Sequence, residues 1–284
     1  MKTVKDWLLW AKKYLKESGA AEFCLDAELF MMKAVNFTKV QLFTRDGYIL
    51  TNEETEFFRR MVERRAAKEP AQYILGMCQF MGLDFYVDKN VLIPRPDTEI
   101  LVEEVIKYIQ SGDIKTAVDI GTGSGCIPIS LVKYGLKEAA AVDISRGALA
   151  VAEKNSVLNG TSGSIKFIES NLFENLGGGY EEYFDAVVSN PPYIKSGVIK
   201  TLMPEVRDNE PLKALDGGGD GLYFYREIVS ESRKYIRERG FLFFEIGYDQ
   251  GESVPRLMKE NGFDNIKVIK DLAGLDRVVL GRKR

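Results

Sequence analysis

Beyond residue 95, short apolar runs alternate with longer amphipathic segments as far as the C-terminus. Seven of these runs have the length and the β-branched or aromatic content of buried strands. They are Thr116–Ile120, Ala139–Asp143, Ile165–Glu169, Phe184–Val188, Phe241–Ile246, Ile266–Lys270 and Arg277–Gly281. Strands that alternate with helices are typical of a parallel sheet, because each parallel pair needs a crossover connection. The pattern therefore predicts an α/β domain over residues 96–284, in which a helix from Ile100 to Gln110 precedes the first strand.

The first 77 residues follow a different period. Apolar residues recur there at helical spacing, in one set around Trp7 and in another around Phe30. A further helix begins near Asn52 and is stopped by Pro70. We therefore expect residues 1–77 to form a small helical bundle domain.

The residues between these two regions, 78–95, are expected to form a β-hairpin linker. Leu83, Phe85 and Val87 alternate with polar residues, as in a strand with one buried face. A turn-like segment and a second apolar run, residues 91–93, follow them. We interpret these two runs as the strands of the hairpin.

Length and composition describe a soluble protein of two domains. Domains usually span about 100 to 200 residues, and 284 residues leave room for a catalytic domain with a smaller companion. Hydrophobic residues make up 45% of the chain and charged residues 29%, which is ordinary for a globular protein. No apolar run is long enough to span a membrane, and the first residues resemble an amphipathic helix more than a signal peptide. The net charge of −3 argues against a main role in binding nucleic-acid phosphates.

Cysteine and histidine usage narrows the chemistry further. Cys24, Cys78 and Cys126 are odd in number and far apart, so we expect no disulfide framework and a reducing cytoplasmic location. The chain contains no histidine, which excludes Ser-His triads and His-ligated zinc. We expect no metal site.

A stiff polar corner, Ser189-Asn190-Pro191-Pro192-Tyr193, follows the predicted strand Phe184–Val188. Neither proline carries an N–H group, and Pro191 favours an extended conformation at Asn190. The corner is therefore short of donors and rich in acceptors, which suits a substrate NH2 group, and Tyr193 adds an aromatic face for a planar group. By itself this pattern also fits an ordinary proline-rich turn.

A glycine-rich turn, Gly121-Thr122-Gly123-Ser124-Gly125, connects the first predicted strand to its helix. Such a turn lets a ligand approach the backbone, and it occurs in dinucleotide-binding loops, in methyl-donor loops and in plain tight turns. Asp143 ends the second strand, where a carboxylate can accept hydrogen bonds from ribose hydroxyls; the alternative role of helix capping can be filled by Ser145. Asn171 and Leu172 end the third strand and either flank an adenine ring or form a surface turn. Ligands of open α/β sheets bind at the carboxyl ends of the strands, so all these residues and Asn190 should face one crevice.

This combination of motifs resembles the S-adenosylmethionine-dependent methyltransferases that act on amide or exocyclic nitrogen, whose signature is Asn-Pro-Pro-Tyr. Further segments resemble the release factor glutamine methyltransferases along the whole chain. These segments are Gln72–Gly76, Phe80–Gly82, Val91–Glu99, Asp119–Gly125, Glu210-Pro211 and Asp216–Gly218. The resemblance implies a seven-stranded Rossmann-like domain and an N-terminal helical domain that helps to hold the substrate. It also implies N5-methylation of the glutamine in the Gly-Gly-Gln loop of bacterial class I peptide chain release factors, with S-adenosyl-L-homocysteine as the second product.

The resemblance further implies roles for individual residues. The methionine part of the donor would lie against Gly121, Thr122, Gly123, Ser124 and Gly125, its ribose on Asp143, and its adenine near Asn171 and Leu172, with Asn190 beside the donor as well. The corner residues Asn190, Pro191, Pro192 and Tyr193 would hold the glutamine amide. Leu92 lies where other members of the family place a phenylalanine against the substrate, so aliphatic packing is expected there.

Two other functions fit parts of the sequence. An N-methyltransferase that acts on an exocyclic amine of adenine or guanine in DNA or RNA would also use the corner. The acidic net charge and the helical N-terminal domain weigh against it. A ligand-binding protein without catalytic activity would not need the intact Asn190 corner. We therefore expect a monomeric cytoplasmic enzyme with a protein substrate and no direct contact with nucleic acid or membrane.

Overall fold

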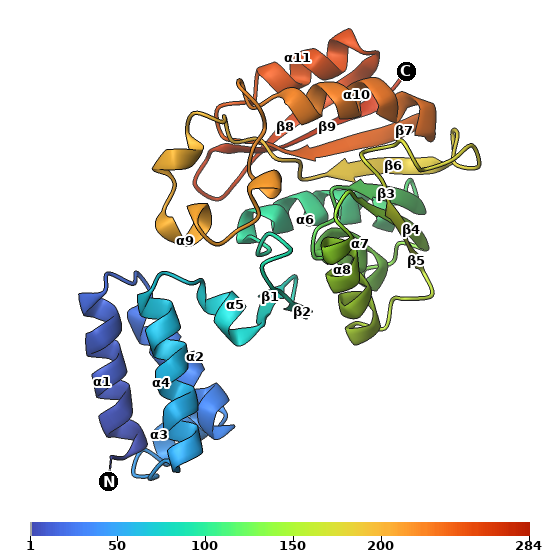
Figure 1. Cartoon of the computed structure of the whole chain (residues 1–284). Helices are drawn as coiled ribbons and strands as arrows, with labels where there is room; N and C mark the ends of the chain where they lie inside the picture. Colours follow the sequence, from blue (N-terminus) through green and yellow to red (C-terminus); the bar gives the residue numbers. More distant parts are fainter. Residues whose placement is uncertain (1) are drawn as a thin grey trace. The chain divides into compact units, whose positions relative to one another are not determined.

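The computed structural model describes residues 2–284, which divide into two compact units. The helical unit comprises the chain as far as Gly76 together with Met203–Asn209. The α/β unit comprises Met77–Leu202 and Glu210–Arg284. Within residues 2–284, no helix has both the length and the apolar character needed to cross a membrane. The two units are described separately below, and Figure 1 identifies their elements by label.

The helical unit confirms the predicted bundle. Its helices are α1 (Val4–Glu17), α2 (Phe23–Val35), α3 (Lys39–Thr44), α4 (Asn52–Ala66), α5 (Ala71–Leu75) and α9 (Pro204–Arg207). Thr3, Thr38 and Thr51 begin α1, α3 and α4 with capping boxes, each of which satisfies two backbone N–H groups at the helix start. Phe30 and Phe58 are fully buried between the long helices, so the apolar period of the sequence builds this core.

The segment Met203–Asn209 belongs to the helical unit although the chain on both sides of it belongs to the α/β unit. Buried Arg65 joins this segment to α2, because its Nε donates to Asp26 Oδ2 at 2.7 Å and its Nη1 to Glu205 Oε1 at 3.3 Å. Asn209 Nδ2 also donates to the carbonyl of Lys68 at 3.1 Å. The sequence pattern placed these residues in the α/β domain, and the structure packs them with the helices.

The hairpin closes earlier than the sequence predicts. It consists of β1 (Met77–Phe80) and β2 (Leu83–Tyr86), joined by Met81 and Gly82. Both turn residues have positive φ, 51° and 70°, as a two-residue hairpin turn requires. The expected second strand at residues 91–93 is therefore wrong. The turn at Met81 and Gly82 was not predicted, because methionine gives no signal for a left-handed turn position.

The sheet of the α/β unit has seven strands in the order β5-β4-β3-β6-β7-β9-β8. The strands are β3 (Thr116–Ile120), β4 (Glu138–Asp143), β5 (Ile165–Glu169), β6 (Phe184–Ser189), β7 (Ile236–Glu245), β8 (Phe263–Lys270) and β9 (Asp276–Lys283). All seven predicted runs are strands. The sequence pattern indicated a parallel sheet, and the sheet is mixed, because β9 is antiparallel to both β7 and β8. The link between β8 and β9, residues 271–275, is too short for a parallel crossover.

Helices cover both faces of this sheet (Figure 1). The helices are α6 (Pro96–Gln110), α7 (Cys126–Lys133), α8 (Arg146–Leu158), α10 (Tyr223–Tyr235) and α11 (Ser253–Glu260), with short 3-10 turns at Ile199–Thr201 and Leu212–Ala214. One core cluster contains residues of α6 and α7, and the other contains residues of α10 and α11. The strand order changes direction beside β3, because β4 lies on one side of it and β6 on the other. Open α/β sheets bind ligands at such a switch point, at the carboxyl ends of the strands.

Candidate functional site

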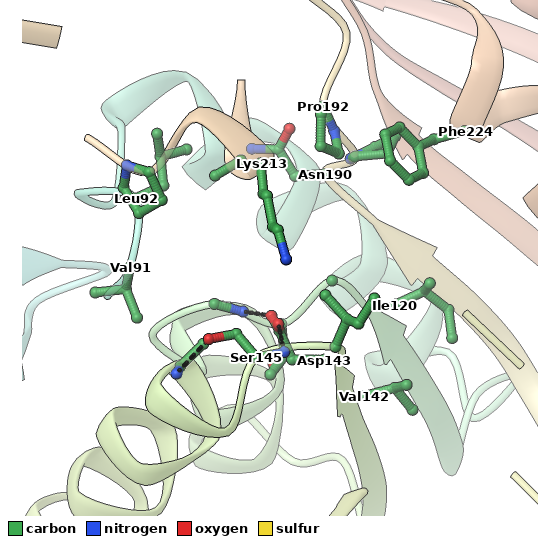
Figure 2. A pocket seen from close by; sticks show the side chains of 18 of the residues that line it. Val91, Leu92, Ile120, Val142, Asp143, Ser145, Asn190, Pro192, Lys213 and Phe224 are labelled. Carbon is green, nitrogen blue, oxygen red and sulfur yellow. Dashed lines mark hydrogen bonds between the residues drawn. The ribbon is translucent and has the colours of Figure 1, made fainter. Parts of the chain in front are cut away.

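A cavity of about 680 Å³ lies at the carboxyl ends of β3, β4 and β6, within the α/β unit (Figure 2). Its size is in the range of small-molecule and cofactor sites. The segments that follow these three strands supply one part of the lining, and the hairpin linker and residues 211–218 supply another. Most of the predicted site residues therefore meet in one place. They are Leu92, Gly121, Thr122, Gly123, Ser124, Asp143, Asn171, Leu172, Asn190, Pro191 and Pro192.

The glycine loop after β3 presents its backbone to this cavity. Gly121 and Gly123 have φ values of 77° and 55°, and no atom lies within 4 Å of the position that a Cβ would take at either residue. The backbone N–H groups of Gly121 and Thr122 donate to the carbonyl of Val142 at 2.9 Å, which holds the loop against β4. Gly125 has another role: it lies outside the lining, and a Cβ there would meet Ala152 and Ile129 at 3.0 Å.

Asp143 connects the glycine loop to the start of α8. Its Oδ2 accepts from the N–H of Gly123 at 2.9 Å, and its Oδ1 accepts from the N–H of Ser145 at 2.8 Å (Figure 2). Ser145 caps α8 by accepting from the N–H of Ala148. Asp143 is therefore not needed as the helix cap, and its carboxylate is available for a ligand. Burial raises the pKa of Asp143, and its backbone donors act in the opposite direction. A carboxylate has about four lone-pair directions, so Asp143 can accept two more hydrogen bonds from a ribose.

A second carboxylate, Asp119, was not among the predicted site residues. It lies in β3 next to Ile120, which lines the cavity. Neither of its buried side-chain oxygens has a hydrogen-bond partner among residues 2–284. Burial raises the pKa of Asp119 to about 7, and the charge of Asp143 adds to this effect. Two acidic groups beside one open backbone loop favour a ligand with positive charge, as a methylsulfonium donor has.

The residues after β5 form another side of the cavity. Leu172 has a φ of 48°, an uncommon conformation for a leucine, which costs on the order of 1 kcal/mol or more. Asn171 is held beside it, because its Nδ2 donates to Glu174 Oε1 at 2.7 Å. The sequence left open whether these two residues flank a ligand or form a surface turn, and the structure places both at the cavity.

Three residues of the polar corner line the cavity and the fourth does not. Asn190, Pro191 and Pro192 are in the lining, and the Nδ2 of Asn190 donates to Thr98 Oγ1 at 3.2 Å. The ring of Tyr193 packs against the core instead, and its hydroxyl donates to Glu245 Oε1 at 3.4 Å. The expected stacking surface of Tyr193 is therefore turned away from the cavity in this structure. Phe224 of α10, an aromatic residue not among the predicted site residues, also lines the cavity (Figure 2).

The loop after α9 also reaches the site. Glu210 is buried and pairs with Arg95, which lines the cavity. Lys213 follows on a 3-10 turn, and its amino group points into the cavity (Figure 2). Gly217 lies so close to the corner that a Cβ there would meet the Cα of Tyr193 at 2.7 Å. The sequence motifs Glu210-Pro211 and Asp216–Gly218 signalled this loop without showing what it contacts.

Comparison with known proteins agrees with the division of the chain. Residues 6–76 match the PrmC N-terminal domain family, and residues 96–220 match the methyltransferase small domain family. The release factor glutamine methyltransferase of Geobacter sulfurreducens is 42% identical over 282 residues, which cover 99% of this chain and 96% of that protein. The protein of the same name from Clostridium botulinum is 39% identical, with 99% of both chains covered.

Solved structures share the fold. The 16S rRNA N2 G1207 methyltransferase of T. Thermophilus, in complex with AdoMet and guanosine, superposes with a TM-score of 0.52 at 19% identity. The match covers 73% of this chain and 50% of that one. At this identity the likeness concerns the fold alone.

Proposed function

Because this chain belongs to the release factor glutamine methyltransferases, we propose that it methylates the side-chain amide nitrogen, N5, of the glutamine in the Gly-Gly-Gln loop of bacterial class I peptide chain release factors. S-adenosylmethionine is the methyl donor, and it supplies an electrophilic methyl group on a positively charged sulfur. The position of Asn190 carries the proposal, since its side-chain oxygen is the acceptor that a primary amide needs. Methylation of a nucleobase is not favoured, because relatives that match almost the entire chain are named for glutamine.

The donor is held by one half of the cavity in this proposal. Gly121 and Gly123 leave the backbone open to the methionine part, and Asp143 accepts hydrogen bonds from the ribose hydroxyls. Asn171 and Leu172 lie beside the adenine. The buried carboxylates of Asp119 and Asp143 favour the positive charge of the donor over the neutral product, which aids product release.

The acceptor is held by the other half. An amide nitrogen is a poor nucleophile, because its lone pair is delocalised into the carbonyl group. Asn190 Oδ1 and the carbonyl of Pro191 accept the two amide hydrogens, orient the nitrogen and stabilise the positive charge that develops on it. Pro192 has no N–H that could compete for these acceptors. The proton leaves to solvent after transfer, so the residues here orient the nitrogen and no histidine is needed.

The remaining assignments are extensions of the same proposal. The helical unit helps to hold the release factor, and the enzyme works as a cytoplasmic monomer without direct contact to nucleic acid. The family match over residues 6–76 supports the role of the helical unit.

Methyl incorporation tests the proposed function. The purified chain would be incubated with radiolabelled S-adenosylmethionine and, in parallel, with a class I release factor, with the same factor carrying alanine at the glutamine of the Gly-Gly-Gln loop, and with RNA or DNA. We expect label in the unaltered factor alone. Label in nucleic acid, or equal label in both forms of the factor, would overturn the proposal.

A further inference from the structure

Asn155 of α8 lies outside the lining of the cavity, and its side chain is fully buried, with 0% exposed. A buried side-chain amide has to find partners for its oxygen and its NH2 group within the protein, because no solvent reaches it. The partners of Asn155 belong to two separate segments of the α/β unit, the glycine loop after β3 and the hairpin strand β2. The function proposed above uses none of these bonds.

The first segment is the end of the glycine loop. Asn155 Nδ2 donates to the carbonyl of Ser124 at 2.9 Å, and Ser124 lines the cavity. Three residues earlier on α8, Ala152 lies so close to Gly125 that a Cβ on Gly125 would meet the Cβ of Ala152 at 3.0 Å. Residues three apart lie on the same side of a helix. One face of α8 therefore holds both residues that end the loop.

The second segment is β2, at the end of the hairpin. Asn155 Oδ1 accepts from the N–H of Tyr86 at 2.6 Å, and Nδ2 donates to the carbonyl of Tyr86 at 3.0 Å. These bonds engage both backbone groups of one residue, as a neighbouring antiparallel strand would. From Tyr86 the chain continues into residues 90–95, most of which line the cavity, Leu92 among them. Asn155 therefore holds the start of the segment that reaches the acceptor half.

We propose that Asn155 is a positioning residue that fixes the donor-binding glycine loop and the hairpin relative to each other. Its NH2 group donates to two carbonyls, those of Ser124 and Tyr86, so one amide group sets the distance between the two segments. Without that NH2 group, two buried carbonyl oxygens would lose their donor. A donor bound at the glycine loop therefore stabilises β2 through Asn155, although β2 lies outside the lining of the cavity. This inference rests on the proposed function, because it places the methyl donor on the glycine loop.

Both segments have further anchors, so loss of Asn155 should loosen them without detaching them. At the hairpin turn, the N–H of Met81 donates to Glu99 Oε1 at 2.6 Å, and the hydroxyl of Tyr134 donates to the carbonyl of Met81 at 2.9 Å. The glycine loop keeps its two bonds to the carbonyl of Val142. A variant at Asn155 should therefore fold, with the loop in its binding conformation in only a fraction of the molecules. The apparent donor affinity falls in proportion to that fraction.

Titration calorimetry with S-adenosyl-L-homocysteine tests the inference without any turnover. Asn155→Ala removes all three hydrogen bonds, and Asn155→Asp keeps the shape but, when ionised, has no hydrogen to donate to the two carbonyls. We expect each variant to raise the Kd by roughly fivefold to a hundredfold, since a buried group left without its partner shifts an equilibrium by about this factor. A Kd within about twofold of that of the unaltered enzyme in both variants would overturn the inference.

Asn159→Ala is the matched control. Asn159 follows α8 directly, and its Nδ2 donates to the carbonyl of Asp84 in β2 at 3.0 Å. The control thus removes a bond between the same end of α8 and the same strand and leaves the bond to the glycine loop intact. Ser156→Ala removes a buried bond to Thr161 from the neighbouring position of α8 and measures the general cost to the fold. The Kd should stay within about twofold in both controls, and a rise in Asn159→Ala equal to that in Asn155→Ala would overturn the inference.

Hydrogen exchange followed by mass spectrometry measures the connection between the two segments. In the unaltered protein, saturating S-adenosyl-L-homocysteine should slow the exchange of the β2 amides severalfold, because ligand binding suppresses local opening. In Asn155→Ala, at saturating ligand, the glycine loop should still be protected and β2 should not. Asn159→Ala should behave like the unaltered protein.

Two results of this experiment would overturn the inference. One is β2 exchange that the ligand leaves unchanged in the unaltered protein, a measurement for which no variant has to fold. The other is protection of β2 that persists in full in Asn155→Ala. An unaltered protein that does not bind S-adenosyl-L-homocysteine would instead refute the proposed function, so the two failures are distinguishable.

Discussion

The two halves of the cavity are built in different ways. The donor half consists mainly of backbone, with glycines at positive φ and one carboxylate, Asp143, that bonds to two backbone N–H groups. The acceptor half depends on side chains, because Asn190 presents its amide group there and holds it by donating from Nδ2 to Thr98 Oγ1 at 3.2 Å. A backbone site is fixed once the loop folds, whereas a side-chain site needs further groups to select its orientation. Substitutions in the donor half should therefore affect binding, and those in the acceptor half should affect turnover.

Asn190→Ala is expected to give the largest difference between the effect on kcat and the effect on the donor Kd. Loss of one preorganised group that stabilises charge in the transition state typically lowers kcat by about a hundredfold to a thousandfold. The donor Kd, measured by titration calorimetry, should stay within about threefold, because the donor half is intact. Equal losses in kcat and in donor affinity would contradict the division into halves. Asn261→Ala, which changes the same residue type at the end of α11, serves as the control.

The pH dependence of the free energy of unfolding tests two buried carboxyl groups, Glu245 and Asp119. In the unfolded chain Glu245 titrates near pH 4.5, and burial raises its pKa to about 7 in the folded protein. Between these values the folded protein binds more protons than the unfolded chain, so the free energy of unfolding falls as the pH rises. The total loss is about 3 kcal/mol for this group, and Asp119, with a pKa raised from 3.8 to about 7, should behave alike.

Urea unfolding between pH 4 and pH 8 checks this expectation. Glu245→Gln and Asp119→Asn should each flatten the profile and gain stability relative to the unaltered protein as the pH rises. Profiles that stay unchanged in both variants would show that neither carboxyl titrates in this range.

Asp143→Ala tests the donor half. The substitution removes the carboxylate that accepts from the N–H of Gly123 and that we propose as the acceptor for the ribose hydroxyls. Hydrogen bonds to charged groups contribute about 1.5–3 kcal/mol, so the donor Kd should rise by roughly tenfold to a hundredfold. At saturating donor, kcat should remain within about threefold. Asp264→Ala on β8 makes the same change of charge away from the residues that line the cavity and should leave the Kd unchanged.

The smallest effect is expected for Ser145→Ala. Loss of the N-cap of α8 should reduce the free energy of unfolding by about 1 kcal/mol. The donor Kd should rise only slightly, because the N–H of Ser145 still donates to Asp143 in the variant. Thr51→Ala removes a comparable cap from α4 and gives the matched loss of stability without any change in Kd. A large change in Kd for Ser145→Ala alone would mean that the cap itself contacts the donor.

The sequence predicted the parts of the site that depend on local signals. Gly121, Asp143 and Asn190 lie at or just after the carboxyl ends of predicted strands, and parallel strands bring these ends to one edge. The strand runs were visible because buried strands are nearly continuous in apolar residues. The fold and the lining of the cavity were therefore largely predictable.

The unpredicted features depend on contacts between distant parts of the chain. Glu245 meets Tyr193 only because β6 and β7 pair in one register, with Ser189 opposite Phe244. Arg65 and Glu205 are 140 residues apart, and no local pattern indicates that they pair.

Tandem mass spectrometry of the release factor tests the central claim most directly. The factor would be treated with the enzyme and S-adenosylmethionine, digested, and the peptide that contains the Gly-Gly-Gln loop fragmented to locate the modification. We predict a single methyl group on the side-chain nitrogen of the glutamine, and a strongly reduced rate of its appearance when the Asn190→Ala variant is used in place of the unaltered enzyme. A methyl group on any other residue, or an unmodified peptide under conditions where the enzyme binds its donor, would contradict it.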